Sequence, residues 1–228
     1  MRRTGRGLVP PLGENTLQDS LDCTDDDASR SLDMTEIYRE ALARFDEVFA
    51  RAGKMEPSEP TAMILATADG EGRPSARTVL LKGVDERGFV FYTNADSRKG
   101  RDLRENPRGA LVFFWQSVFE QVQVEGRVEP VSDGEADAYW ATRRRESRIG
   151  ALVSDQSAPL ASREELNARF AEEEKRHADG PIPRPPNWRG YRVVPDRIEF
   201  WRPGDHRLNE RDCYERTAGG WRRFLLNP

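Results

Sequence analysis

The sequence predicts an α+β fold, with a β-barrel core and peripheral helices. Short runs of β-branched and aromatic residues follow one another from residue 61 onward, separated by Gly- and Asp-containing turn signals, as in antiparallel sheets. No strand-helix-strand alternation runs through them, so a closed or nearly closed barrel, which leaves few free strand edges, is favoured. Segments with helical periodicity or capping signals indicate helices outside the barrel.

We expect one domain, residues 34–228, preceded by a tail. Residues 1–33 are rich in Gly, Pro, Ser and Asp and carry too little apolar surface to offset the entropy of ordering, so this tail is expected to be disordered. An amphipathic helix is expected from Met34, because apolar residues then recur every four positions. They are Ile37, Ala41, Phe45 and Phe49.

The remaining elements follow from composition and capping signals. The expected strands cover residues 61–68, 76–84, 88–94, 109–118, 120–131, 190–202, 207–216 and 221–226. The expected helices cover residues 97–106, a segment from Ser132 toward Arg145 and a segment from Ser162 toward His177; Ser132 with Glu135 and Ser162 with Glu165 form capping boxes.

The composition argues against several classes of function. With 36 basic and 40 acidic residues and a formal charge of −4, the chain has no general attraction for nucleic acid or an anionic membrane. The two cysteines and two histidines have no metal-ligand spacing, so no metal site is expected. No apolar run reaches the roughly 18 residues of a membrane span. We therefore expect a soluble, reduced, cytoplasmic protein.

Motifs of common enzyme classes are missing. G-x-S-x-G, H-E-x-x-H, Walker and G-x-G-x-x-G motifs are absent, and neither histidine stands beside a convincing nucleophile. Basic and hydroxyl side chains instead gather in a few places. Ser97 can cap a helix whose free amides and positive dipole end attract a phosphate, with Arg98 and Lys99 adding charge. The alternative for this segment is a solvated helix face.

A second group consists of Tyr139, Arg143 and Ser147. Their spacing of four would place a phenol, a guanidinium and a hydroxyl along one helical stripe, a combination suited to phosphate, although an ordinary surface helix is the alternative. Further candidates are Arg77 and Lys82 on one expected strand, Gln156 and Ser157 in a polar loop, and Trp201 with Arg207 and Arg211 near the C-terminus. If the stretch RLNER is a strand, Arg207, Asn209 and Arg211 share one face.

Two phosphate-binding groups, several aromatic residues and no acid-base machinery indicate a phosphorylated cofactor that carries the chemistry, with a phosphorylated substrate beside it. The motifs present are RTVLLKGVDERGFVFYTNADSRKGRDLRENPRGALVFFW, QVQVEGRVEPVS, Y-x-x-x-R-x-x-x-S-x-I-G-A, DQS, PRPPNWRGYRV-x-P-x-R-IEFW and RL-x-x-R. As an ordered set over roughly residues 58–228 they resemble the pyridoxine/pyridoxamine 5'-phosphate oxidase family.

This resemblance implies a homodimer with a split β-barrel fold that binds FMN in clefts at the dimer interface. The residues that match the family's FMN contacts are Arg77, Thr78, Val79, Leu80, Lys82, Tyr92, Thr93, Arg98, Lys99, Gln121, Gln156, Ser157, Trp201 and Arg211. Those that match the contacts of the substrate phosphate are Lys82, Tyr139, Arg143 and Ser147. Arg207 and Asn209 would cover the substrate ring as catalytic residues while a hydride passes to the flavin, which O₂ then reoxidises to give H₂O₂.

Three residues depart from the family pattern. Asn209 and Gln116 stand where the family usually has histidine, and Glu120 stands where it has arginine. Glu120 reverses a charge beside the expected flavin contact Gln121, where it could weaken anionic reduced flavin or pair with an arginine nearby. The family's N-terminal R-x-x-Y segment has no clear counterpart in this chain.

The expected function is an FMN-dependent oxidase of pyridoxine or pyridoxamine 5'-phosphate. One alternative is a specialised-metabolism oxidase acting on another ring system, as the phenazine-biosynthesis FMN oxidases act on dihydrophenazines. Another is a flavin- or pyridoxal-phosphate-binding protein without turnover. The intact set of substrate-phosphate residues favours the first hypothesis, whereas the departures leave the true substrate open.

Overall fold

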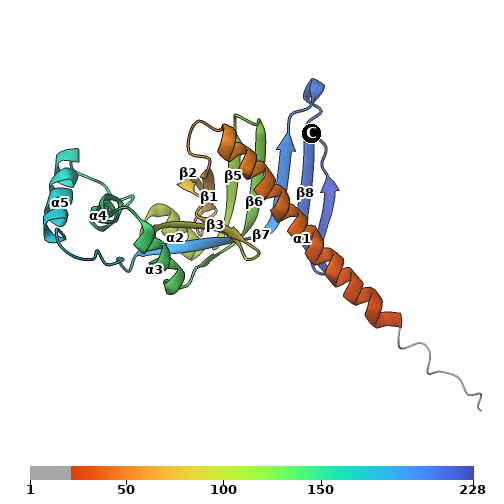
Figure 1. The fold of residues 1–228 in the computed structure, drawn as a ribbon, viewed down its shortest axis with the longest axis horizontal. Helices are drawn as coiled ribbons and strands as arrows, with labels where there is room; N and C mark the ends of the chain where they lie inside the picture. The colour runs from red at the N-terminus through yellow and green to blue at the C-terminus, as the bar shows by residue number, and fades with distance from the viewer. Residues whose placement is uncertain (1–21) are drawn as a thin grey trace, which may run out of the picture.

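A curled, antiparallel β-sheet forms the centre of the protein, as the computed structural model shows for residues 22–228, with side chains described from residue 36 onward (Figure 1). The described part contains nine strands, paired in the order β2-β1-β5-β6-β7-β4-β3, with β8 on β7 and β9 on β8. Their bounds are β1 Ala62–Ala68, β2 Pro74–Leu80, β3 Gly83–Asp85, β4 Gly88–Asn94, β5 Arg108–Trp115, β6 Glu120–Pro130, β7 Trp188–Arg202, β8 Glu210–Thr217 and β9 Gly220–Leu225. The expected α+β fold with a barrel-like core is confirmed.

Helix α1 (Asp22–Met55) begins ahead of the expected start at Met34, within the segment expected to be a disordered tail. The rest of that tail, residues 1–21, lies outside the described residues. Phe45 is fully buried and lies edge-on to Phe89 and Phe113, with ring centroids 4.9 and 5.2 Å away. The expected apolar face of α1 therefore packs on the interior of the sheet.

The chain between residues 76 and 84, expected as one strand, is two strands in the structure. β2 ends at Leu80 and β3 begins at Gly83, because Leu81 turns into the core and its amide donates to Thr61 O at 2.8 Å. Since β2 and β3 form the two ends of the strand order, this short bend brings the sheet close to closure.

A bulge in β6 increases the curvature of the sheet. The register with β7 shifts between Glu125 and Gly126, and a Cβ atom at Gly126 would lie 1.9 Å from Val194 O. Only glycine allows the two backbones to approach this closely.

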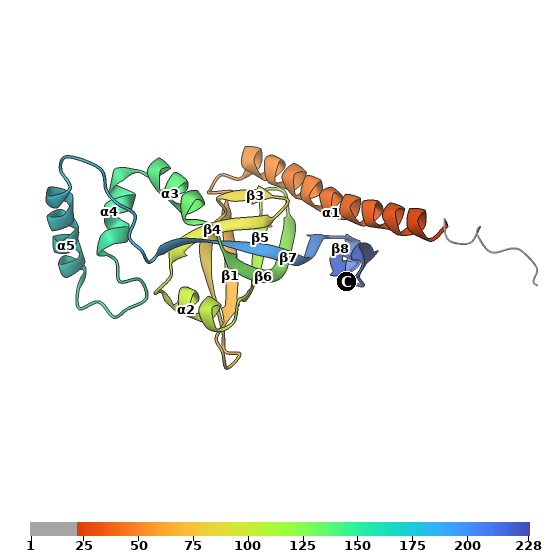
Figure 2. The same cartoon turned by 90° about the horizontal axis from the view of Figure 1, so that it is seen from below.

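The helices α3, α4 and α5 lie together on one side of the barrel, opposite α1 (Figures 1 and 2). Helix α2 (Arg98–Glu105) lies beside the sheet, and the others span Asp133–Thr142 (α3), Arg145–Val153 (α4) and Arg163–Arg176 (α5). The capping box of Ser132 with Glu135 is present, and Ser162 accepts a hydrogen bond from the amide of Glu165.

The helix expected from Ser132 toward Arg145 is present as α3, but it ends at Thr142 and does not continue to Ser147. Arg143 has the extended conformation φ −72°, ψ 145°, so α3 ends there and α4 starts at Arg145. Tyr139, Arg143 and Ser147 consequently do not lie on one helical stripe.

The stretch RLNER is also not a continuous strand. Arg207 belongs to a short 3₁₀ helix (Asp205–Arg207) and has φ +66°, and β8 begins only at Glu210. A shared strand face for Arg207, Asn209 and Arg211 is therefore ruled out. Among the residues that the structure describes, no helix is long and apolar enough to cross a membrane.

Candidate functional site

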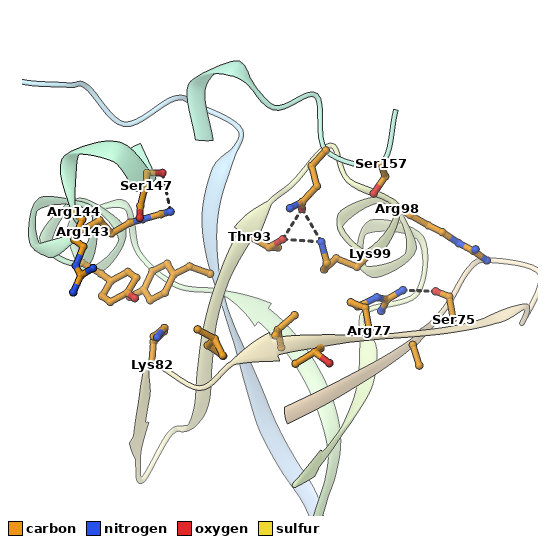
Figure 3. A pocket seen from close by; sticks show the side chains of 17 residues that line it. Ser75, Arg77, Lys82, Thr93, Arg98, Lys99, Arg143, Arg144, Ser147 and Ser157 are labelled. Atoms are coloured by element: carbon orange, nitrogen blue, oxygen red, sulfur yellow. Dashed lines mark hydrogen bonds between the residues drawn. The ribbon is translucent and has the colours of Figure 1, made fainter. Parts of the chain in front are cut away.

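A cleft of about 830 Å³ lies between the barrel wall and the helices beside it. Figure 3 shows basic side chains at two separate ends: Arg77, Arg98 and Lys99 at one, Lys82 and Arg143 at the other. Most of the expected site residues line it, namely Arg77, Thr78, Val79, Leu80, Lys82, Tyr92, Thr93, Arg98, Lys99, Tyr139, Arg143, Ser147, Gln156 and Ser157. Ser75, Ala76 and Arg144 line it as well, although the sequence did not single them out.

Lys99 lies in the first turn of α2, at one end of the cleft. It is buried, and its Nζ donates to Thr93 Oγ1 at 2.9 Å, Ser97 Oγ at 3.1 Å and Gln156 Oε1 at 2.7 Å. Burial, and secondarily the charge of Arg77, lowers the pKa of this ammonium to about 8. Because the three hydrogen-bond partners are neutral, the positive charge remains available to an anion.

The guanidinium of Arg77 is oriented by its neighbours. It donates to Leu65 O at 3.1 Å and to Thr67 Oγ1 at 2.8 Å, and also to Ser75. Asp102, buried on α2, accepts from Thr67 at 2.7 Å and Ser75 at 2.8 Å and lies 3.7 Å from Arg77. Burial alone would raise the pKa of Asp102, but these hydrogen bonds and the charge of Arg77 hold it below its usual value.

The other end of the cleft is built by α3, α4 and the bend between them. Arg143 donates to Ser147 O at 3.0 Å, so the extended residue between the helices turns its guanidinium toward α4. Tyr139 stacks on Tyr92 with ring centroids 4.2 Å apart, and Lys82 lines the same end from the bend after β2. The residues expected to hold a substrate phosphate therefore meet here, although the helical spacing that predicted them is broken.

Three other expected contacts form a row elsewhere on the sheet. Gln121 on β6 pairs with Trp201 on β7, which pairs with Arg211 on β8, and directly paired residues share a face. The row continues to the exposed Phe114 on β5. These three residues do not line the cleft.

Arg207 and Asn209 are also separate from the cleft. Arg207 is exposed, whereas Asn209 and Arg211 line a second groove of about 850 Å³ between α1 and the strands β8 and β9. The side-chain Oδ1 of Asn209 accepts from the amide of Gly204 at 3.3 Å, which leaves its NH₂ group as a donor.

Glu120 has a charged partner in the structure. Its carboxylate is buried and accepts from Arg51 of α1 at 2.9 and 3.1 Å, one bond to each oxygen. Of the two consequences considered for this departure, pairing with a nearby arginine is the one observed. The sequence could not show it, because α1 reaches β6 only through the fold.

The curled antiparallel barrel and the cleft beside it define a class: split-barrel proteins, here with a cleft that carries basic side chains at both ends. The family described as pyridoxamine 5'-phosphate oxidase matches residues 51–177, and the pyridoxine 5'-phosphate oxidase C-terminal dimerisation region matches residues 188–228. The chain belongs to the pyridoxamine 5'-phosphate oxidase family.

Individual relatives agree with this assignment. A pyridoxine/pyridoxamine 5'-phosphate oxidase of Myxococcus xanthus (strain DK1622) is 57% identical over 187 residues, which cover 82% of this chain and 91% of the relative. One from Alkalilimnicola ehrlichii is 56% identical over 195 residues, which cover 85% of this chain and 100% of the relative.

Solved structures show the same fold. PhzG from Burkholderia lata 383, in complex with tetrahydrophenazine-1-carboxylic acid, superimposes with a TM-score of 0.75 at 34% identity and covers 82% of this chain and 91% of its own. A pyridoxamine 5'-phosphate oxidase-related, FMN binding protein from Nostoc punctiforme has a TM-score of 0.66 at 19% identity, with 82% and 96% covered, and supports the fold alone.

Proposed function

We propose that the protein is an FMN-dependent oxidase of pyridoxine 5'-phosphate or pyridoxamine 5'-phosphate. The observation that carries this proposal is the presence of two separate cationic groups in one cleft: Lys99 with Arg77 at one end and Arg143 with Lys82 at the other. A phosphorylated cofactor and a phosphorylated substrate need such an arrangement, and the relatives with this name are more than half identical to the chain.

The residues at the α2 end fit the phosphate of FMN. Arg98 would donate to it, each charge-assisted hydrogen bond contributing about 1.5–3 kcal/mol, and Lys99 would attract it by its charge, since the three N–H groups of its ammonium donate to Thr93, Ser97 and Gln156. Gly100 keeps this turn compact, since a Cβ atom there would lie 2.2 Å from Ala95 O. The cleft volume is within the usual range for cofactor sites.

We infer that the functional form is a homodimer. Of the five expected contacts absent from the cleft, four fall within the region matched by the dimerisation family, namely Trp201, Arg207, Asn209 and Arg211; the fifth, Gln121, is paired with Trp201. The exposed face that carries Phe114 continues the row of Trp201 and Arg211. A second copy packed on this face would bring these residues to the first copy's cleft.

When bound, FMN supplies a hydride acceptor that O₂ reoxidises with release of H₂O₂. The protein's own part is to bind and orient: Lys82, Tyr139, Arg143 and Ser147 hold the substrate phosphate, and Arg207 and Asn209 of the second copy cover the ring. Asn209 can donate a hydrogen bond but cannot take up a proton near neutral pH, as a histidine could. The cytoplasm is the expected compartment, consistent with the free, buried Cys213.

The second candidate function, suggested by the similarity to PhzG, is oxidation of a dihydrophenazine-like ring. The convergence of Tyr139, Arg143 and Ser147 in the cleft favours a phosphorylated substrate instead.

Anaerobic bleaching of bound flavin tests the proposal. Purified protein is expected to be yellow, and pyridoxine 5'-phosphate should bleach the flavin without oxygen, whereas unphosphorylated pyridoxine should not. Bleaching by a dihydrophenazine alone would replace the substrate assignment. A colourless protein that takes up no added FMN would overturn every version of the oxidase function.

A further inference from the structure

Arg143 is held in place by neutral groups. Its guanidinium carbon lies 4.9 Å from the ring centroid of Trp188 and 5.3 Å from that of Trp140, and it donates to Ser147 O at 3.0 Å. No ion pair among the described residues includes Arg143, whereas Arg184 nearby is paired with two aspartates of α3. Burial lowers the pKa of Arg143, yet an arginine stays charged at neutral pH.

Trp188, whose ring lies against the guanidinium of Arg143, is itself fixed by its neighbours. Trp188 is buried at the start of β7 and stacks on Tyr92 with centroids 5.1 Å apart and planes 8° from parallel. Its other neighbour, Trp140, meets it edge-on at 4.8 Å and is anchored by an Nε1 hydrogen bond to Ile182 O at 2.8 Å. These rings form a second hydrophobic cluster, apart from the barrel core, that joins β7 to α3 and α4.

A glycine permits this stack. Gly190 pairs with Tyr92 across β7 and β4, and a Cβ atom at Gly190 would lie 2.5 Å from the tyrosine ring. Without that atom, the ring of Tyr92 can lie over Gly190 and stack on both Trp188, at 5.1 Å, and Tyr139, at 4.2 Å; Tyr139 and Trp188 are themselves 6.1 Å apart. The stack thus runs from the cleft wall to the ring that supports Arg143.

We propose that Trp188 is a positioning residue for phosphate recognition, acting through Arg143. A carboxylate in its place would orient the guanidinium but also neutralise it, and the cleft would lose affinity for an anion. An aromatic face attracts the cation while leaving its charge and its outward N–H groups free. This inference rests on the proposed function, in which Arg143 binds the substrate phosphate.

The test compares pyridoxal 5'-phosphate with pyridoxal, which differ only in the phosphate. Binding of each to the purified, flavin-loaded protein is measured by equilibrium dialysis, and the ratio of the two dissociation constants gives the phosphate preference. Trp188→Leu is expected to reduce this preference about fivefold to tenfold, in line with a partly desolvated cation–π contact. Trp188→Phe, which keeps an aromatic face, should retain most of it. In turnover, KM for pyridoxine 5'-phosphate should rise while kcat changes little.

A double-mutant cycle separates positioning from a general effect on folding. In an Arg143→Ala background, Trp188→Leu should have no further effect on the phosphate preference, because the group it orients is gone. An equal loss in both backgrounds would overturn the proposal. If Trp188→Leu does not fold, Trp188→Met serves as the ring-less variant in the same cycle.

Trp221 provides a matched control. It is equally buried, stacks on Tyr38 at 4.6 Å and carries Arg216 over its ring at 5.1 Å, but lies outside the cleft. Trp221→Leu should lower thermal stability without changing the phosphate preference. A wild-type protein without the phosphate preference would overturn the proposed substrate and the role of Trp188 together. An Arg143→Ala variant that keeps the preference would do the same. If Arg143→Ala loses the phosphate preference but Trp188→Leu retains it, only the positioning role of Trp188 is wrong.

Discussion

Single charged residues are adjusted by partners that the sequence does not reveal. Lys99 is surrounded by neutral oxygens, Arg77 is held by Asp102, and Glu120 is paired with Arg51. The first arrangement leaves a positive charge uncompensated, whereas the last neutralises the buried carboxylate of Glu120. Whether a charged side chain is available to a ligand is thus decided by its immediate neighbours.

Binding of FMN by the apoprotein is expected to weaken above pH 8. The pKa of Lys99 is lowered from 10.5 to about 8, so burial of the charged ammonium disfavours the folded state below pH 8, and this cost declines as the pH rises toward 10.5. The phosphate needs the charged form, so affinity should fall by up to about tenfold per pH unit above that pKa. Fluorescence titrations with FMN from pH 7 to pH 9.5 measure this.

The control is Lys99→Arg, whose guanidinium stays charged throughout this range and should give a flatter profile. Equal FMN affinity of the unmodified protein at pH 7 and pH 9 would contradict the expected role of Lys99.

At the scale of elements, the site depends on how two helices are attached to the barrel. Asp102 joins α2 to β1 and β2 through Thr67 and Ser75. The α3 end is joined to β7 by Glu135, which accepts from Arg192 at 2.9 Å. This contact lowers the pKa of Glu135 to about 2, so the attachment is complete above pH 4.5 and is lost as the pH falls toward 2.

Replacing Asp102 tests the attachment of α2. Asp102→Asn removes a buried charge that faces Arg77, so the free energy of unfolding should drop by about 1–3 kcal/mol in urea denaturation. The carboxylate of Asp102 also favours the charged form of Lys99, so removing its charge should lower the pKa of Lys99 further. The FMN affinity of Asp102→Asn should therefore begin to fall at a lower pH than that of the unmodified protein. Asp46→Asn, an exposed position on α1, should change neither property. Unaltered stability in Asp102→Asn would show that the carboxylate does not hold α2.

At the scale of the whole molecule, the residues expected at one site lie in two separate places on the chain. The cleft contains both cationic ends, while Trp201 and Arg211 lie in the row across the outer face of the sheet. That face also carries the exposed side chains of Phe114 and Phe119, whose rings are 5.9 Å apart. Exposed apolar patches are typical of surfaces that bind another protein.

A charge on this face should separate the proposed dimer. Phe114→Asp is expected to give a monomer in size-exclusion chromatography with light scattering, and to release flavin, since contacts from the second copy are then lost. Leu160→Asp, an exposed position in the loop before α5, should leave both mass and flavin content unchanged. A monomeric Phe114→Asp protein that keeps its flavin would show that one chain suffices for cofactor binding.

Local sequence patterns determined the elements and the chemistry available to them. The period-four apolar residues of α1, the capping serines Ser97 and Ser132 and the alternation in β6 depend on nearest neighbours along the chain, and the structure contains all of them. The helix between Ser132 and Arg145 could not be delimited in this way. Arg143, where the helix ends, contacts Trp188 and Ser147, and one of these partners is far along the chain.

The sequence by itself thus determined that this protein has a β-barrel core and carries two groups of basic and hydroxyl side chains of a kind suited to phosphate. Only the tertiary structure decided that both groups share one cleft, that Glu120 is neutralised by Arg51, and that Gln121, Trp201 and Arg211 face elsewhere. The physical reason is that residue type and spacing govern local backbone conformation, whereas charge pairing, burial and orientation depend on groups that only the folded sheet brings together.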